Sequence, residues 1–190
     1  SIDAARVSGV QAKIADYGVQ FKAIADSQIK IGLEAGSGLY GELRSAVHEA
    51  EAVVKTHADH EMQSRLLMLR RAEKDFMLRR DPKYVVKFEN DFHSLKNIVS
   101  RAELPDADHQ KLVKALGSYR QKFLSLVEAE KDIGLTHTDG KLGGLRQTVH
   151  EVETELTSLS QTLNKEIDAA AQTMKWTLYA AIIGIIFAAA

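Results

Sequence analysis

Apolar residues recur at alternating spacings of three and four along most of this chain, which places them on one face of a helix. The first such stripe is Val10, Ile14, Tyr17, Phe21, Ile24, Gln28 and Ile31; the second is Leu112, Leu116, Tyr119, Phe123, Leu126, Glu130 and Ile133; the third is Leu145, Val149, Val152, Leu156, Leu159, Leu163 and Ile167. No strand-like alternation stands out. We therefore predict an all-α protein of long antiparallel helices, with the aromatic residues of the stripes in the core.

Glycine and proline mark where the predicted helices end. The chain has two prolines, Pro82 and Pro105, and most of its glycines fall within 32–41 and 134–144. We predict helices over 3–31, 39–80, 82–102, 108–133 and 141–190, which makes five segments. Each glycine-rich stretch is expected to join two antiparallel helices, because glycine tolerates the left-handed conformation that ends a helix.

The chain contains an internal repeat, in which IGLEAGSGLYGELRSAVHEAE (31–51) matches IGLTHTDGKLGGLRQTVHEVE (133–153) without a gap. His48 recurs as His150, which predicts a shared packing or hydrogen-bonding role for the two histidines. Two similar hairpins and a long connecting helix predict two helical bundles stacked end to end.

The C-terminal residues 177–190, TLYAAIIGIIFAAA, carry no charge and follow Lys175 and Trp176. Lysine and tryptophan favour the headgroup zone of a membrane. Since a span needs roughly 20 apolar residues, we predict that 176–190 begin a transmembrane helix that is cut short. The alternative is a buried hydrophobic C-terminal helix. The chain begins at Ser1 and shows no signal peptide, so we expect one or more N-terminal helices to be missing.

Composition narrows the function. Lysine and arginine number 25 against 26 acidic residues, so no basic excess points to nucleic acid. Cysteine is absent, which excludes disulfides and thiolate metal sites. His57, His60 and Glu61 have a spacing compatible with a metal, but a solvated helix face explains them better. We find no phosphate-binding loop and no nucleophile elbow, and predict that the chain is not an enzyme and needs no cofactor.

The segment LLMLRRAEKDFMLRRDPKYVVKF (66–88) resembles the signature of the helical bimodular sensor domain of methyl-accepting chemotaxis proteins, and the repeats resemble the same family. The resemblance implies six helices in two stacked four-helix bundles that share long helices. It also implies a homodimer that recognises small organic acids, such as tricarboxylic-acid-cycle intermediates or acetate. The expected sixth helix is assigned to the missing N-terminal part.

Four arginines are candidates for binding a carboxylate ligand, because the planar guanidinium donates paired hydrogen bonds. Arg44 and Arg146 follow the glycine-rich stretches, and Arg70 and Arg71 lie within the signature. The alternative for each is an ion pair on the surface or between helices, for which Glu73 and Asp75 are nearby partners.

These observations predict that 1–175 form the periplasmic sensing region of a chemoreceptor in the inner membrane and that 176–190 begin its second transmembrane helix. Ligand binding is expected to displace a helix and so to control chemotaxis signalling through a cytoplasmic part. Two alternatives stay open. One is the sensor region of a membrane histidine kinase, and the other is a membrane-anchored structural or protein-binding helical bundle.

Overall fold

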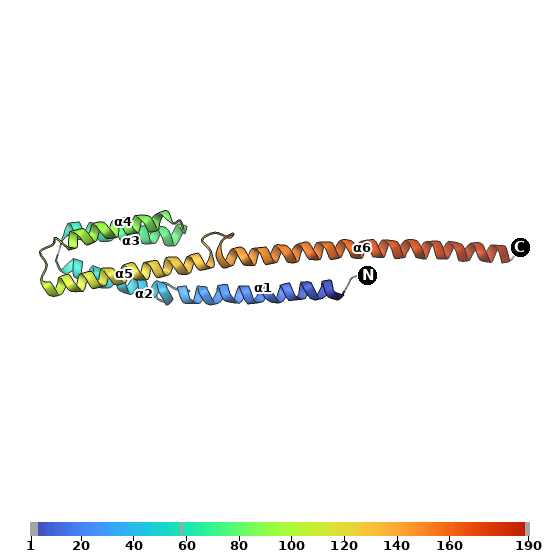
Figure 1. Ribbon diagram of the computed structural model, residues 1–190, viewed down its shortest axis with the longest axis horizontal. Helices are drawn as coiled ribbons and strands as arrows, with labels where there is room; N and C mark the ends of the chain where they lie inside the picture. Colours follow the sequence, from blue (N-terminus) through green and yellow to red (C-terminus); the bar gives the residue numbers. More distant parts are fainter. Residues whose placement is uncertain (1–3, 58, 189–190) are drawn as a thin grey trace. The chain divides into compact units, whose positions relative to one another are not determined.

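The computed structural model describes residues 4–57 and 59–188, and these residues are almost entirely helical. The described residues form α1 (Ala4–Ile31), α2 (Gly38–Thr56), α3 (His60–Arg79), α4 (Lys83–Val99), α5 (Asp106–Ile133) and α6 (Gly140–Ala188) (Figure 1). The all-α prediction is confirmed. Residues 3 and 189–190 of the predicted helices lie outside the described residues. The chain divides into two compact units, one of residues 20–144 and one that joins the residues up to 19 with those from 145 onward.

The unit of residues 20–144 contains a four-helix bundle, in which α2 packs along α5 and α3 packs along α4 (Figure 1). Helices α2 and α5 are antiparallel. The hydroxyl of Tyr40 lies 3.0 Å from Glu130 near one end of the pair, and Nε2 of His57 lies 3.0 Å from Asp108 at the other. A short turn at Arg80, whose φ is 53°, joins α3 to α4.

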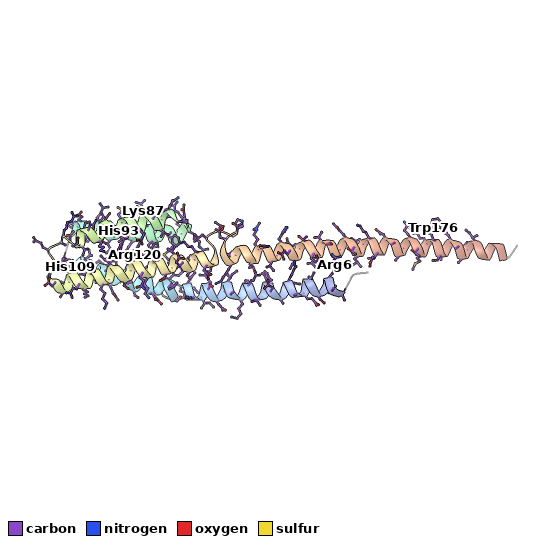
Figure 2. The ribbon with its side chains drawn as sticks, in the orientation of Figure 1. Arg6, Lys87, His93, His109, Arg120 and Trp176 are labelled. Atoms are coloured by element: carbon purple, nitrogen blue, oxygen red, sulfur yellow. The ribbon has the colours of Figure 1, made fainter. Side chains whose placement is uncertain are left out.

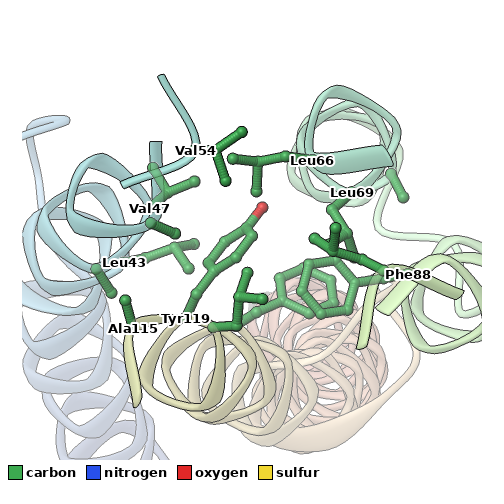
Figure 3. Packing of buried hydrophobic residues seen from close by; sticks show 14 of the residues in the cluster. Leu43, Val47, Val54, Leu66, Leu69, Phe88, Ala115 and Tyr119 are labelled. Atoms are coloured by element: carbon green, nitrogen blue, oxygen red, sulfur yellow. The ribbon is translucent and has the colours of Figure 1, made fainter. Parts of the chain in front are cut away.

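Aromatic rings from three helices form the centre of this bundle. Phe88 of α4 stacks on Phe123 of α5 with ring centroids 4.1 Å apart, and Phe76 of α3 meets Phe123 edge-on at 5.7 Å. Tyr119 lies against Phe88 and rises from α5 toward Val54 and Leu66 (Figure 3). Tyr119 and Phe123 are fully buried, so their predicted place in the core is confirmed.

The prediction of one continuous helix over 39–80 is wrong. Helix α2 ends at Thr56, and α3 starts at His60. Asp59 caps α3, because its side chain accepts a hydrogen bond of 2.9 Å from the backbone N–H of Met62. An aspartate in this role satisfies one of the unpaired N–H groups of the first helical turn. The break produces six helices in the described residues, so the expectation of five segments is also wrong.

The glycine-rich stretches do not join antiparallel partners as predicted, since the helix that packs along α2 is α5. The two stretches nevertheless share one conformation. Gly38 and Gly140 begin α2 and α6 with φ of 55° and 53°, a region that favours glycine. A Cβ at Gly38 would lie 2.5 Å from the carbonyl oxygen of Lys30, and one at Gly140 would lie 2.7 Å from that of Asp132. The sequence repeat is therefore also a structural repeat.

In the second unit, the first part of α1 runs antiparallel to α6. Arg6 donates from Nε to Glu155 at 2.9 Å and from Nη2 to Ser158 at 2.8 Å (Figure 2). Lys13 pairs with Glu151 at 2.8 Å. Apolar side chains of both helices are exposed in this unit, among them Ile14 and Leu156.

The prediction that Tyr17 and Phe21 lie in the core is wrong. Tyr17 is 38% exposed and Phe21 is 57% exposed, whereas Phe123, its counterpart in the repeat, is 0% exposed. The physical reason is the number of neighbours. Three helices enclose the stripe of α5, and the described residues provide no such enclosure for α1.

Helix α6 continues past Trp176, which is 70% exposed, into the uncharged C-terminal residues. Among the described residues, no helix combines the length and the apolar character that crossing a membrane requires.

Candidate ligand-binding site

A small cavity of about 270 Å³ opens between α2 and α3 of the four-helix bundle. The side chains around it share a pattern, in which apolar residues of the bundle core form the inner wall and basic residues form the mouth. They are Ala35, Tyr40, Leu43, Arg44, Val47, His48, Arg70, Glu73, Lys74 and Met77. A volume of this size holds a small metabolite. A few polar groups in a mostly apolar cleft are typical of a ligand site. We call it the α2–α3 pocket.

A chain of four side chains links α2 to α3 beside the α2–α3 pocket, and three of them, Arg44, His48 and Arg70, line it. Nε of Arg44 donates to Nε2 of His48 at 3.4 Å, and Nδ1 of His48 lies 3.0 Å from Oε2 of Glu51. The other carboxylate oxygen of Glu51 accepts from Nη1 of Arg70. The first three residues meet because i, i+4 and i+7 positions share one face of a helix, and Arg70 joins them from α3.

The charges along this chain of side chains keep Glu51 ionised and leave Arg44 able to bind an anion. Partial burial opposes ionisation of Glu51, but the hydrogen bonds from Arg70 and His48 outweigh it and lower the pKa of its carboxyl. Glu51 is therefore ionised at neutral pH and occupied by two partners. No described carboxylate forms an ion pair with Arg44, so its guanidinium keeps donors for an anion.

The floor of the α2–α3 pocket is a buried acid. Glu73 is 1% exposed and accepts a hydrogen bond of 2.6 Å from the hydroxyl of Tyr119. Its other oxygen pairs with Nζ of Lys74 at 2.7 Å. Burial and the adjacent Glu73 charge raise the pKa of Tyr119, so its hydroxyl stays a donor. These partners offset the cost of an acid in the core.

No family model matches this chain, and neither a curated protein nor a solved structure matches it.

The structure brings together two of the four predicted arginines. Arg44 and Arg70 line the α2–α3 pocket from opposite helices. Arg71 does not line it; its side chain is 72% exposed and lies 3.9 Å from Asp75, which is the surface ion pair considered as the alternative. Arg146 is exposed on α6 and belongs to the other unit. Arg70 and Arg71 are consecutive but differ in this way because consecutive helical residues point about 100° apart.

Four polar residues that line the pocket are not among the ligand candidates predicted from the sequence, and these are Tyr40, His48, Glu73 and Lys74. Glu51, which joins His48 to Arg70, is also not among those candidates. The spacing of Arg44, His48 and Glu51 on one helical face was the available signal. Glu73, Lys74 and Asp75 are consecutive charged residues, and this pattern gives no indication that Glu73 alone points inward.

A larger hollow of about 780 Å³ lies among the end of α1, α5 and the start of α6 within residues 20–144. Two of its cations already have partners. Arg120 holds Glu89 through two nitrogens, at 3.0 and 2.8 Å, and Lys141 pairs with Asp132 and with Ser27. These pairs make the hollow a poorer anion site than the α2–α3 pocket.

The metal-compatible spacing of His57, His60 and Glu61 does not become a cluster. Among the residues that the structure describes, no group of three possible ligands converges. His57 instead bridges to Asp108 on α5.

Proposed function

We propose that this chain is the sensing region of a transmembrane chemoreceptor and that a small organic acid binds in the α2–α3 pocket. The observation that carries the proposal is the convergence of Arg44, His48, Arg70 and Lys74 on one small cavity. Arg44 supplies donors that no described carboxylate occupies. The apolar wall suits the hydrocarbon part of a dicarboxylate, and the cations suit its oxygens.

The resemblance of 66–88 to the sensor signature supports the same assignment, because this segment forms α3 and the start of α4. Its Arg70 and Lys74 line the pocket. In the proposed mechanism, the ligand draws α2 and α3 together. Packed helices respond by discrete shifts of about 1–2 Å. Helix α6 has no glycine or proline from Leu145 to Ile183, so it can pass such a shift along its axis.

We further propose that 176–190 begin a membrane span and that 1–175 lie in the periplasm. The exposed Trp176 and the uncharged residues after it support this. Trp176 is the single tryptophan of the chain, so its fluorescence reports on this segment alone. Vesicles of phosphatidylcholine should shift its emission to shorter wavelength. Unchanged emission would argue against membrane contact at Trp176.

A second copy of the chain is proposed to cover the apolar face of the α1–α6 pair and so to complete a second, stacked bundle. Exposed apolar residues on both helices support this, with Ile14 at 53% and Leu156 at 49%. Helices of a bundle bury such faces against one another. Sedimentation equilibrium should show a dimer that Leu156→Glu dissociates. A monomer at all concentrations would contradict the proposal.

The decisive experiment for the ligand class is thermal unfolding of the chain with malate, succinate, citrate and acetate. A ligand that binds only the folded state stabilises it by about 2.7 kcal/mol at a hundredfold excess over Kd. Arg44→Gln should remove the shift. Arg146→Gln is the matched control, since it changes the equivalent residue of the repeat outside the pocket, and should keep it.

Three outcomes distinguish the possible sites and functions. A shift lost in Arg44→Gln alone supports the α2–α3 pocket. A shift lost in Arg146→Gln alone moves the site to the other unit. The absence of any shift across the panel favours a structural or protein-binding bundle.

A further inference from the structure

Both ring nitrogens of His48 have a partner in the arrangement that the structure shows. Its Nε2 faces Nε of Arg44 at 3.4 Å, and a guanidinium nitrogen can only donate. Nε2 must therefore carry a lone pair. Its Nδ1 faces a carboxylate oxygen of Glu51 at 3.0 Å, and an ionised carboxylate can only accept. The hydrogen of the ring therefore lies on Nδ1, and the wall of the pocket is a satisfied chain of donors and acceptors.

Arg44 contacts His48 at one ring nitrogen, and the carboxylate of Glu51 contacts it at the other. The charged and titratable groups around it come from three helices: Tyr40, Arg44 and Glu51 on α2, Arg70, Glu73 and Lys74 on α3, and Tyr119 on α5. Arg70 compensates Glu51, and Lys74 compensates Glu73. Arg44 remains as an uncompensated cation next to the imidazole. A bound anion would reverse this balance.

We propose that a small carboxylate binds in the α2–α3 pocket together with a proton, which is taken up at Nε2 of His48. This inference rests on the proposed anion pocket. A proton from solvent bonds to Nε2, so that this nitrogen no longer accepts from Arg44. The imidazolium and the released guanidinium then both donate to the ligand carboxylate. Nδ1 keeps its hydrogen bond to Glu51, which orients the ring. The uptake is one proton per ligand at most, and no other bond is formed or broken.

This coupling makes the affinity for the acid depend on pH. Imidazole side chains change charge between about pH 5 and 8. If one proton enters with each ligand, affinity rises by up to about tenfold for each pH unit that the solution is acidified. The pocket would then report the acid and the acidity together.

Isothermal titration of the chain with malate tests the inference. Titrations near neutral pH in two buffers with different ionisation heats measure the protons taken up. The unmodified chain should take up a fraction of a proton per malate and bind more tightly at lower pH. His48→Gln, which stays neutral, should bind more weakly with no uptake and no pH dependence. His48→Lys, which stays charged, should bind malate with an affinity that does not change with pH.

His150→Gln is the matched control, because His150 is the equivalent residue of the repeat and is exposed on α6. It should take up protons as the unmodified chain does. Nitrogen NMR of the unliganded chain gives a readout that needs no ligand. The ring of His48 should show the Nδ1–H tautomer, and the Nε2–H tautomer would overturn the inference.

The outcomes separate the two proposals. Malate binding without proton uptake, or with the same uptake in His48→Gln, overturns the coupling and leaves the anion pocket standing. No malate binding at any pH overturns the pocket as a site for this ligand and the coupling with it.

Discussion

The hydroxyl of Tyr119 donates a hydrogen bond of 2.6 Å to Glu73, which lies 46 residues earlier in the chain. Both residues are buried in the four-helix bundle, and Glu73 also lines the α2–α3 pocket. The bond links α5, which carries the core aromatics, to α3, which carries Arg70. It therefore connects the stability of the bundle to the geometry of the candidate site.

Tyr119→Phe should destabilise the bundle by about 1.5–3 kcal/mol, because it leaves one oxygen of a buried carboxylate without its donor. Urea unfolding followed by circular dichroism measures the loss. Tyr179→Phe is the control, since Tyr179 is exposed on α6 and its loss should stay within about 0.5 kcal/mol. Equal stability of the two variants would show that the hydrogen bond contributes nothing to folding.

Tyr40 should make the fold sensitive to alkali. Burial, then the charge and hydrogen bond of Glu130, raise the pKa of Tyr40 to about 12 from 10.0. A raised pKa stabilises the fold fully below about pH 10, the unfolded value, and this contribution is lost as the pH rises toward about 12. The free energy of unfolding, measured by urea across this range, should fall less steeply in Tyr40→Phe. An unchanged slope would contradict the assignment.

Substitution by alanine should have opposite effects on stability at two glycines, Gly38 and Gly117. Gly38→Ala should destabilise by more than about 1–2 kcal/mol, because φ is 55° and the new Cβ would meet the carbonyl oxygen of Lys30. Gly117→Ala should stabilise by about 0.5–1 kcal/mol, because Gly117 lies inside α5 with nothing within 4 Å of a Cβ. Chemical denaturation of both variants checks the signs, and a stable Gly38→Ala would show that the loop adopts another conformation.

The break between α2 and α3 can be tested by replacing Asp59, the N-cap residue of α3. Asp59→Ala should cost about 1 kcal/mol through the lost hydrogen bond to Met62, and Asp59→Asn should retain most of it. In a continuous helix over 39–80, alanine would instead be the better residue at this position. An increase in stability measured for Asp59→Ala would therefore favour the continuous helix.

The sequence alone determined the local features of this protein. The apolar spacing of three and four defined the helices, and the prolines and glycines placed most of their ends within a few residues. The repeat in the sequence is also a repeat in backbone conformation, since Gly38 and Gly140 have nearly the same φ. These features follow from interactions between residues close in the chain, which periodicity and backbone sterics report directly. The cap at Asp59 was also local, but the helical pattern on both sides concealed it.

The tertiary structure decided which faces are covered and which charges meet. Phe21 and Phe123 occupy equivalent positions of the repeat, yet Phe21 is exposed and Phe123 is buried. Arg44 and Arg146 are also equivalent, yet only Arg44 reaches the pocket with Arg70. A periodic stripe states that one face of a helix is apolar but does not state which helix covers it. Burial, ion pairing and the pocket itself depend on that neighbour, and the neighbours here lie tens of residues apart in the chain.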